Sequence, residues 1–169
     1  MISIIMGIYN CADTLTEALD SIANQTYTDW ELIMCDDGSS DKTYEAAEKY
    51  IQEHPEYKIK LLRHKKNKGL NQTLNDCLKV ASGEYIGCMD ADDISLPTRF
   101  EKEIAEFKKD PNFSVVSCPM IYFDENGEWG VGKCDNDYPK KGDLVFGTVH
   151  AHAPCLIKRE AIRAVKGYS

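Results

Sequence analysis

Asp90, Ala91 and Asp92, followed by Asp93, place three carboxylates within four residues of the chain. They come directly after the apolar run 85–89, and a short apolar run of this kind indicates a buried strand. Crowded carboxylates repel one another unless something neutralises them. A hard divalent cation such as Mg²⁺ or Mn²⁺ prefers oxygen ligands. The spacing therefore predicts a metal site for a phosphate-bearing substrate; the alternative is a solvated acidic turn that caps the next helix.

Two more polar clusters follow apolar runs in the same way: Tyr9-Asn10 after the first run and Asp36-Asp37-Gly38 after the second. In an open parallel sheet, ligands bind outside the carboxyl ends of the strands, where the strand order reverses. A carboxylate such as Asp37 can accept a hydrogen bond from a base N–H, Tyr9 can flank the base, and backbone groups around Gly7 can fix it. We therefore expect a nucleotide-plus-metal site, in which the cation holds a diphosphate and stabilises its charge as it departs.

The elements that must position these clusters alternate between strand and helix through about residue 110. Thr14 to Glu17 match a capping box, which predicts the start of the first helix. This alternation predicts an α/β fold with a mainly parallel sheet built from crossover units. The expected strands are 2–9, 30–35, 59–62 and 85–89; the expected helices begin near residues 14, 41, 70 and 97.

After Pro111 the pattern changes to strands at 113–118 and 120–123, a hairpin turn at 125–128 and a loop at 134–143. A strand at 154–158 and a short helix from Arg159 follow. We interpret this as a change of topology inside a single domain, 1–169. Residues 127–133 match the spacing of a phosphate-binding loop, but Cys134 replaces the Ser or Thr that would hold magnesium. A hairpin rim is the better interpretation.

Composition narrows the class of protein. The 169 residues are 43% apolar and 28% charged, as in soluble domains, and a net charge of −8 argues against a nucleic-acid partner. Seven cysteines without a C-x-x-C pair suit a reducing compartment. The N-terminus has no signal-peptide pattern, and no apolar run approaches the ~18 residues that span a bilayer. We expect a cytoplasmic protein, peripheral at most, at the inner face of the membrane.

Four segments in order also carry a family resemblance: "SIIMGIYN", "QTYTDWELIMCDDGSSD", the stretch from "NKGLN" to "ASGEYI", and "MDADDISLPTRF". Together they resemble the family 2 glycosyltransferases of the GT-A fold, a Rossmann-like three-layer sandwich with helices on both faces of the sheet. The resemblance covers essentially the whole chain. It implies a nucleotide-sugar donor, UDP-linked in our interpretation, a Mn²⁺ or Mg²⁺ cofactor, and a saccharide or lipid-linked acceptor.

The resemblance also assigns roles to matching residues. It makes Asp37 the base-binding aspartate and Tyr9 part of the base pocket, with Gly69 and Asn71 in a loop that closes over the nucleoside. Asp90, Ala91 and Asp92 match the D-x-D motif. Asp92 is the expected metal contact, and Asp90 is expected at the ribose or the metal. His150 and His152 lie in a region that the family often places near the diphosphate, and we include His152 as a candidate metal ligand; the alternative is a partly exposed structural histidine. His54 and His64 are expected at the surface.

The family's catalytic base is an aspartate well after the segment that matches Gly167-Tyr168, so we expect it beyond Ser169 and expect this chain to be the donor-binding part, truncated before that base. Residues 1–110 would hold the nucleotide, and 111–169 would begin the acceptor side. The acids from Glu101 to Asp110 are expected to be solvated. The expected reaction is inverting sugar transfer. Alternatives are a nucleotidyltransferase, or a donor-binding module without transferase activity.

Overall fold

The computed structural model describes residues 1–132 and 152–169. Its centre is a six-stranded sheet with the order β3-β2-β1-β4-β8-β5, and the strands β6 and β7 pair in a separate two-stranded sheet. The strands are β1 (Ile2–Ile8), β2 (Trp30–Asp36), β3 (Ile59–Arg63), β4 (Tyr85–Cys88), β5 (Val115–Ser117), β6 (Met120–Asp124), β7 (Gly127–Gly132) and β8 (Cys155–Lys158).

The first four strands run parallel to one another, which confirms the expected mainly parallel sheet. β8 is antiparallel to both β4 and β5, so two strands from the second half of the chain extend the same sheet. From β1 the chain moves outward to β2 and β3, then returns to place β4 on the other side of β1. The strand order therefore reverses between β1 and β4, which is where open α/β sheets bind ligands.

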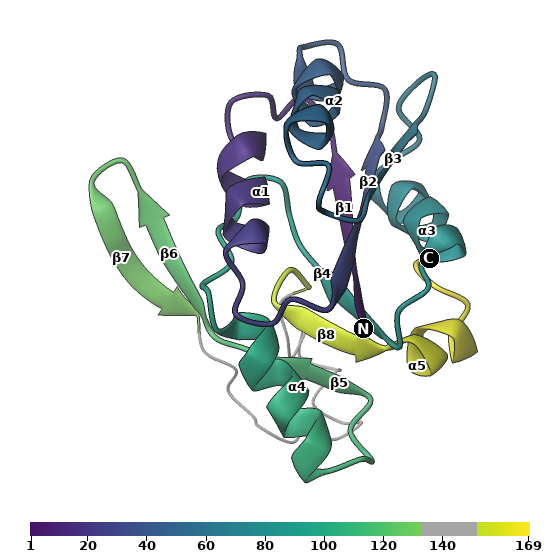
Figure 1. Ribbon diagram of the computed structural model, residues 1–169, viewed down its shortest axis with the longest axis vertical. Coiled ribbons are helices and arrows are strands. Elements are labelled where there is room, and N and C mark those ends of the chain that lie inside the picture. The colour runs from purple at the N-terminus through teal and green to yellow at the C-terminus, as the bar shows by residue number, and fades with distance from the viewer. Residues whose placement is uncertain (133–151) are drawn as a thin grey trace.

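Alternation along β1 divides the core between the two faces of the sheet. Ile2, Ile4 and Met6 belong to one buried cluster, and Ile5 belongs to the other. The first cluster includes residues of α1, α2 and α4, and the second includes residues of α3 and α5, so helices cover both faces (Figure 1). The helices are α1 (Leu15–Ala23), α2 (Thr43–Glu53), α3 (Leu70–Val80), α4 (Arg99–Lys109) and α5 (Arg159–Ala164).

Most expected elements are present within a residue or two of their predicted bounds. The hairpin turn is Glu125-Asn126, because Asp124 pairs with Gly127. Gly127 to Gly132 form strand β7, so the part of the phosphate-loop pattern that the structure describes is a strand. The expected loop at 134–143, Cys134 and His150 lie outside the described residues. Among the described residues, no helix is both long and apolar enough to cross a bilayer.

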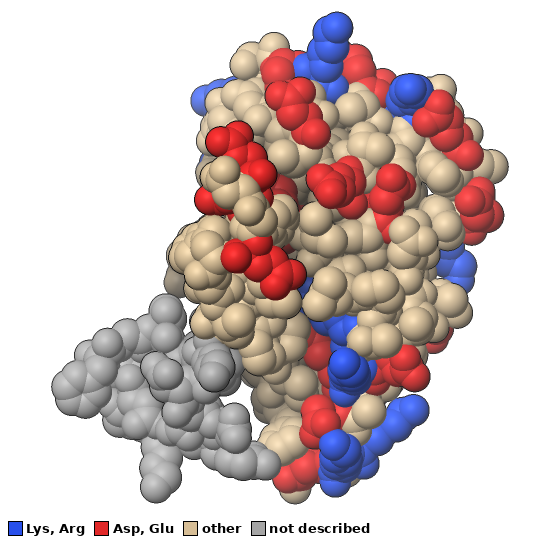
Figure 2. Space-filling model, turned by 90° about the vertical axis from the view of Figure 1, so that its left-hand side faces the viewer, with Lys and Arg blue, Asp and Glu red and all other residues tan. Residues whose placement is uncertain are grey.

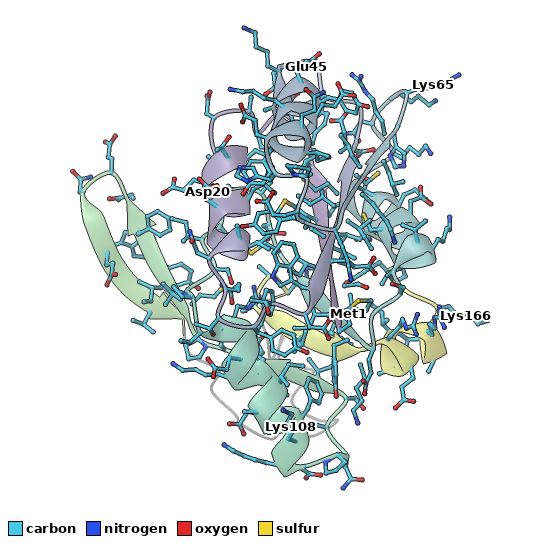
Figure 3. All side chains as sticks on the ribbon, in the orientation of Figure 1. Met1, Asp20, Glu45, Lys65, Lys108 and Lys166 are labelled. Carbon is cyan, nitrogen blue, oxygen red and sulfur yellow. The ribbon has the colours of Figure 1, made fainter. Side chains whose placement is uncertain are left out.

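The surface is charged and the interior is apolar. Side chains fill the space between the sheet and the helices, whereas the labelled Lys65 and Lys166 project outward (Figure 3). On the face drawn in Figure 2, acidic side chains occupy the upper and middle part, and Lys and Arg gather nearer its top and bottom. None of the six cysteines in the described segments is paired in a disulfide.

Candidate functional site

The three polar clusters lie at one edge of the sheet. Tyr9 follows β1, Asp37 follows β2, and Asp90 comes two residues after the end of β4. β2 and β4 are the two direct neighbours of β1, and all three strands run in the same direction. The carboxyl ends of parallel strands meet at one edge, so the predicted placement of Asp37, Asp90 and Asp92 on one edge is confirmed at the level of topology.

Asp37 is a buried carboxylate that anchors the loop between β3 and α3. Its Oδ1 accepts a hydrogen bond from the Lys68 backbone N–H at 2.8 Å, and its Oδ2 accepts one from the Gly69 N–H at 2.8 Å. Burial raises the pKa of Asp37, but hydrogen bonds from His64, Lys68 and Gly69 outweigh burial and leave the pKa below its usual range. Asp37 is therefore ionised at neutral pH.

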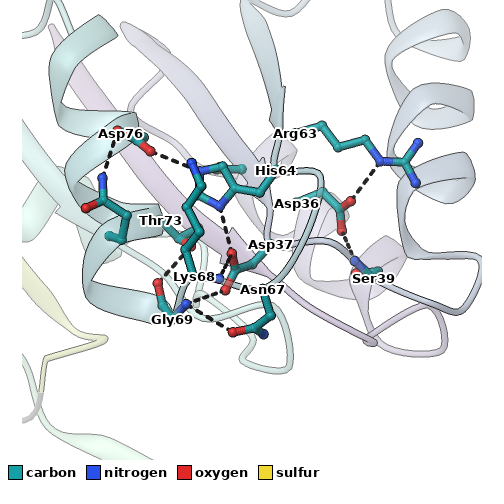
Figure 4. A network of polar contacts seen from close by, with 12 residues as sticks. Asp36, Asp37, Ser39, Arg63, His64, Asn67, Lys68, Gly69, Thr73 and Asp76 are labelled. Atoms are coloured by element: carbon teal, nitrogen blue, oxygen red, sulfur yellow. Dashed lines mark hydrogen bonds and ion pairs between the residues drawn. The ribbon is translucent and has the colours of Figure 1, made fainter.

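The expectation that His64 lies at the surface is wrong. The residue is buried, and only 7% of it is exposed. Its Nδ1 lies 2.7 Å from Asp37 Oδ1 and its Nε2 lies 2.9 Å from Asp76 Oδ2, so the ring bridges two carboxylates (Figure 4). Burial lowers the pKa of His64, but the hydrogen bonds to Asp37 and Asp76 outweigh this and raise it. Arg63, Lys65 and Lys66 surround His64 in the sequence and suggest an exposed segment, and no short-range pattern marks His64 as buried.

Hydrogen bonds join the loop after β1 to the loop after β2. The Asn10 side-chain oxygen accepts from the Ser40 N–H at 2.9 Å, and the Asn10 N–H donates to Ser39 Oγ at 3.0 Å. The Cys11 N–H donates to Thr43 Oγ1 at 2.8 Å. Tyr9, at the start of this joined pair of loops, leaves 48% of its surface exposed and is accessible to a ligand.

The acidic segment after β4 combines a buried backbone with carboxylates of different exposure. Asp92 is exposed, whereas Asp90 and Asp93 are partly buried. Burial and the charge of Asp92 raise the pKa of Asp90, against the opposing effect of His152. Burial and the charges of Asp90 and Asp92 raise the pKa of Asp93. The three carboxylates are therefore close enough to repel one another, as the sequence predicted.

The sequence predicts that Thr14 caps α1, and the structure contradicts this prediction. Its side chain makes no capping hydrogen bond, and its backbone is helical, with φ −105° and ψ −24°. Its hydroxyl instead donates to the Ala91 carbonyl at 2.9 Å. Capping boxes satisfy local backbone N–H groups, and this hydroxyl serves a partner 77 residues away. The start of α1 is thereby tied to the centre of the D-x-D segment.

His152 faces the acidic segment from the other half of the chain. Its pKa is lowered by burial, with Asp90 opposing that shift, so the two side chains are near each other. Its Nε2 lies 2.9 Å from the Tyr168 hydroxyl, which lies 3.5 Å from Cys88 Sγ. Burial raises the pKa of Tyr168, so the hydroxyl stays protonated. His152 is thus oriented by a partly buried neutral partner.

Arg99 fixes the same two segments to each other. It is buried, and its Nη2 donates to the carbonyls of Cys88 and Ala153, each at 3.0 Å. Its Nε donates to Glu103 Oε1 at 3.2 Å. The expectation that the acids from Glu101 to Asp110 are solvated is wrong for Glu103, which is 2% exposed, because α4 turns this position toward the buried arginine.

The remaining predicted residues have clear structural settings. A Cβ on Gly7 would lie 2.8 Å from Leu70 Cδ1, so glycine here lets α3 approach β1 closely. Gly69 has φ +89°, and its N–H reaches Asp37. The expected loop position is wrong for Asn71, because α3 begins at Leu70 and includes it; its amide donates to the Ser169 carbonyl at 2.6 Å. Gly7 and Gly69 therefore shape the backbone around Asp37.

The carboxylates after β4 fit a hard divalent cation. Burial, together with the charges of neighbouring aspartates, raises the pKa values of Asp90 and Asp93, and a cation bound among these carboxylates would favour their charged forms. Within residues 1–132 and 152–169, no three His, Cys, Asp or Glu side chains form a complete protein cage for a metal. Mg²⁺ usually binds through one or two carboxylates together with substrate phosphates and water, so two aspartates without a cage suit it.

Comparison with known proteins gives a consistent result. The model of the family described as glycosyl transferase family 2 matches residues 3–165. "Putative glycosyltransferase EpsE" of Bacillus subtilis (strain 168) is 42% identical over 167 residues, which are 99% of this chain and 59% of that protein. An Escherichia coli UDP-Glc:alpha-D-GlcNAc-diphosphoundecaprenol beta-1,3-glucosyltransferase is 38% identical over 109 residues, which are 64% of this chain and 42% of that protein. The chain thus spans less than two thirds of these relatives.

Solved structures share the fold. A mannosyltransferase from Pyrobaculum calidifontis, in complex with GDP-Man and Mn²⁺, has a TM-score of 0.76 and 23% identity, and the match covers 99% of this chain and 47% of that one. Staphylococcus aureus TarS 1–349, in complex with UDP-GlcNAc, has a TM-score of 0.77 and 22% identity, with coverage of 99% and 48%. At these identities the likeness shows the α/β fold of these transferases.

Proposed function

Because this chain belongs to glycosyl transferase family 2, we propose that its protein transfers a sugar from a nucleoside-diphosphate sugar to an acceptor hydroxyl. One observation carries the proposal: Asp37 and the Asp90–Asp92 segment follow the two strands that flank β1, at the carboxyl edge where the strand order reverses. A base-binding group and a diphosphate-binding group at this edge match the two ends of a nucleotide donor.

The nucleoside end of the donor is assigned to Asp37, Tyr9 and the Gly69 loop. An ionised carboxylate has about four lone-pair sites, and three of those on Asp37 accept from His64, Lys68 and Gly69. The remaining site, on Oδ2, can accept a base N–H. Tyr9 supplies an exposed ring against the base, and we assign Gly69 and Asn71, close to each other along the chain at the start of α3, to the nucleoside as well. A pyrimidine imide N–H suits this acceptor, so we propose a UDP-linked donor.

The diphosphate end is assigned to Asp92, Asp90 and Ala91, with His152 beside them. Asp92 and Asp90 would hold Mn²⁺ or Mg²⁺, with His152 as a further candidate ligand. The cation, when bound, supplies Lewis-acid stabilisation of the departing diphosphate. The protein's own contribution is to fix the segment: Thr14 holds the Ala91 carbonyl and Arg99 holds the end of β4. The similar mannosyltransferase structure contains Mn²⁺, which supports this assignment.

The transfer step needs a base to take the proton of the acceptor hydroxyl. In an inverting displacement, which we propose here, that base lies opposite the leaving diphosphate. No carboxylate among the described residues is assigned to this task, since Glu103 is buried against Arg99 and Asp93 belongs to the acidic segment. We propose that residues 1–110 bind the donor, that 111–169 begin the acceptor side, and that an aspartate beyond Ser169 supplies the base.

The acceptor is proposed to be a saccharide or a lipid-linked saccharide. The E. coli relative is named for transfer onto a diphosphoundecaprenol-linked sugar, which supports the lipid-linked form. An enzyme acting on such an acceptor works at the membrane surface. We therefore propose a cytoplasmic protein that associates peripherally with the inner face of the membrane.

Titration calorimetry with UDP tests the proposal. We expect UDP to bind at least tenfold more tightly with Mn²⁺ than with EDTA, because without the cation the diphosphate meets uncompensated carboxylates. Asp92→Asn should remove the difference. Asp124→Asn, on the exposed hairpin, is the matched control and should keep it. Equal affinity with and without metal in the unsubstituted protein would contradict the proposed role of Asp92.

A further inference from the structure

The ring of His64 joins two carboxylates that belong to different elements. Asp37 follows β2 and Asp76 is on α3, and the side chains of His64 and Asp37 are each 6% exposed. Both ring nitrogens lie at hydrogen-bonding distance from a carboxylate oxygen, at 2.7 and 2.9 Å. Ionised carboxylates only accept hydrogen bonds, so the ring satisfies both when both nitrogens carry protons. The geometry thus selects the imidazolium, a cation between two anions.

Other charged and titratable groups around His64 also affect the protonation of its ring. From β2, the thiol of Cys35 lies 3.6 Å from Nε2, and from the loop, the charge of Lys68 opposes protonation of His64. Asp76 also pairs with Lys79 and accepts a hydrogen bond from Gln72 at 3.1 Å, so α3 holds it in place from the outer side. Burial disfavours the charged ring. The hydrogen bonds to Asp37 and Asp76 outweigh this effect and favour the imidazolium, because they are short and shielded from water.

The position of Asp37 depends on this ring. Asp37 Oδ1, which contacts His64, also accepts a hydrogen bond from the Lys68 N–H, and Oδ2 accepts one from the Gly69 N–H. The Asp37 carboxylate therefore links the His64 ring to the backbone of the loop. Figure 4 shows the chain of contacts from Asp76 through His64 to Asp37 and on to Gly69. A neutral ring has only one N–H, so one of the two carboxylates would lose its donor.

We propose that His64 and Asp76 are a positioning pair, which holds the Asp37 carboxylate and the 65–69 loop in the geometry that accepts the nucleoside and makes donor affinity depend on the charge of His64. The inference rests on the proposed function, because it takes the nucleoside to bind at Asp37. Asp76 acts on Asp37 through the His64 ring. Its own carboxylate contacts His64, Gln72 and Lys79.

The pH dependence has a definite sign. The pKa of His64 is raised above its ordinary value, so the imidazolium persists to higher pH than in an unperturbed histidine and is lost as the pH rises through the raised value. The pKa of Asp37 is lowered, so its charge is lost only in acid. Donor affinity should therefore be constant between these limits and weaken on the alkaline side.

The experiment combines nitrogen NMR of the histidine rings with UDP affinity in Mn²⁺ between pH 6 and 9. In the ligand-free protein at pH 6, both ring nitrogens of His64 should carry protons, whereas a His64 ring that is already neutral at pH 6 would overturn the inference. His64→Gln should bind UDP and uridine about tenfold more weakly, without an alkaline decline, and should keep the ratio of affinities in Mn²⁺ and EDTA. The control is His54→Gln, at a histidine that lies beside Glu56. It should change neither the affinity for UDP nor its dependence on pH.

Asp76→Asn separates positioning from simple loss of structure. It keeps an acceptor for Nε2 but removes one negative charge, so the alkaline decline in UDP affinity should move to lower pH while affinity at pH 6 is retained. An unchanged profile in Asp76→Asn, or unchanged affinity in a folded His64→Gln, overturns this inference alone. Failure of the unsubstituted protein to bind UDP at any pH overturns the proposed function and this inference with it.

Discussion

Thr14 illustrates how a single hydroxyl can serve the site from outside it. The residue stands before α1, yet its hydroxyl donates to the Ala91 carbonyl between the two aspartates of the D-x-D segment. Asp92, the proposed metal contact, is exposed and has no hydrogen bond of its own among the described residues. The direction of the Asp92 side chain therefore depends on its backbone, and Thr14 is one of the groups that fix this backbone.

Thr14→Val should weaken metal-dependent UDP binding several-fold and lower the free energy of unfolding by about 1 kcal/mol, the typical net contribution of one hydrogen bond. The substitution keeps the shape of the side chain and removes its donor. Urea denaturation and calorimetry would measure the two effects. Thr16→Val, at an exposed position two residues later, is the control; an equal effect of both variants would show that the contact with Ala91 is unimportant.

At the scale of single residues, chemistry was easier to predict than environment. The two aspartate clusters were identified from residue type and from their position after apolar runs. His64 was missed because it lies in a stretch of charged residues, and its partners Asp37 and Asp76 are 27 and 12 positions away. Nothing in the sequence near His64 reports those distant carboxylates, and only the packing of α3 against β2 brings them together.

Helix α4 connects the end of β4 to the segment before β8 through the buried Arg99. Arg99 donates hydrogen bonds to the Cys88 carbonyl at the end of β4 and to the Ala153 carbonyl just before β8. Glu103 partly balances the charge of Arg99. Burial raises the pKa of Glu103 to about 7, with Arg99 opposing the shift, and Oε2 has no hydrogen bond among the described residues. This carboxylate is therefore costly to ionise.

Glu103→Gln should make the protein more stable at alkaline pH. The raised pKa means that the folded protein binds more protons than the unfolded chain between about pH 4.5 and 7, so the stability of the unsubstituted protein falls across that window. The variant does not titrate there. Its advantage should be absent near pH 4.5 and reach roughly 1 to 3 kcal/mol at pH 8.

Urea denaturation at a series of pH values would measure this difference. Glu106→Gln, on the exposed side of the same helix, is the matched control and should give a difference that does not change with pH. A Glu103→Gln variant whose stability falls with pH as steeply as that of the unsubstituted protein would assign the pH dependence to other groups.

At the scale of elements, periodicity predicted the helices and strands well because each helix buries one apolar stripe and each central strand is buried on both faces. Helix starts were less predictable. The Thr14 to Glu17 pattern suggested a capping box, but a partner far along the chain took the Thr14 hydroxyl. Local patterns describe local hydrogen bonds, and tertiary contacts replace them where two elements meet.

For the molecule as a whole, the alternation of elements predicted a mainly parallel sheet, and the polar clusters that follow its strands predicted its carboxyl edge as the site. The positions of β5 and β8 could not be predicted in the same way. Their short apolar runs fit either direction. The antiparallel pairing of β5 with β8 joins residues about 40 positions apart, and that of β8 with β4 joins residues about 70 positions apart. The sheet brings His152 from this part of the chain toward Asp90, a proximity that no sequence spacing shows.

The central claim is that a cation and a nucleoside diphosphate bind together at this edge. Anomalous diffraction near the manganese edge, from crystals grown with UDP and Mn²⁺, tests it most directly. We predict one strong manganese peak beside Asp90 and Asp92, with the diphosphate on the metal and the base against Tyr9 and Asp37. UDP bound at another edge of the sheet, or at this edge with no manganese beside Asp92, would contradict the account.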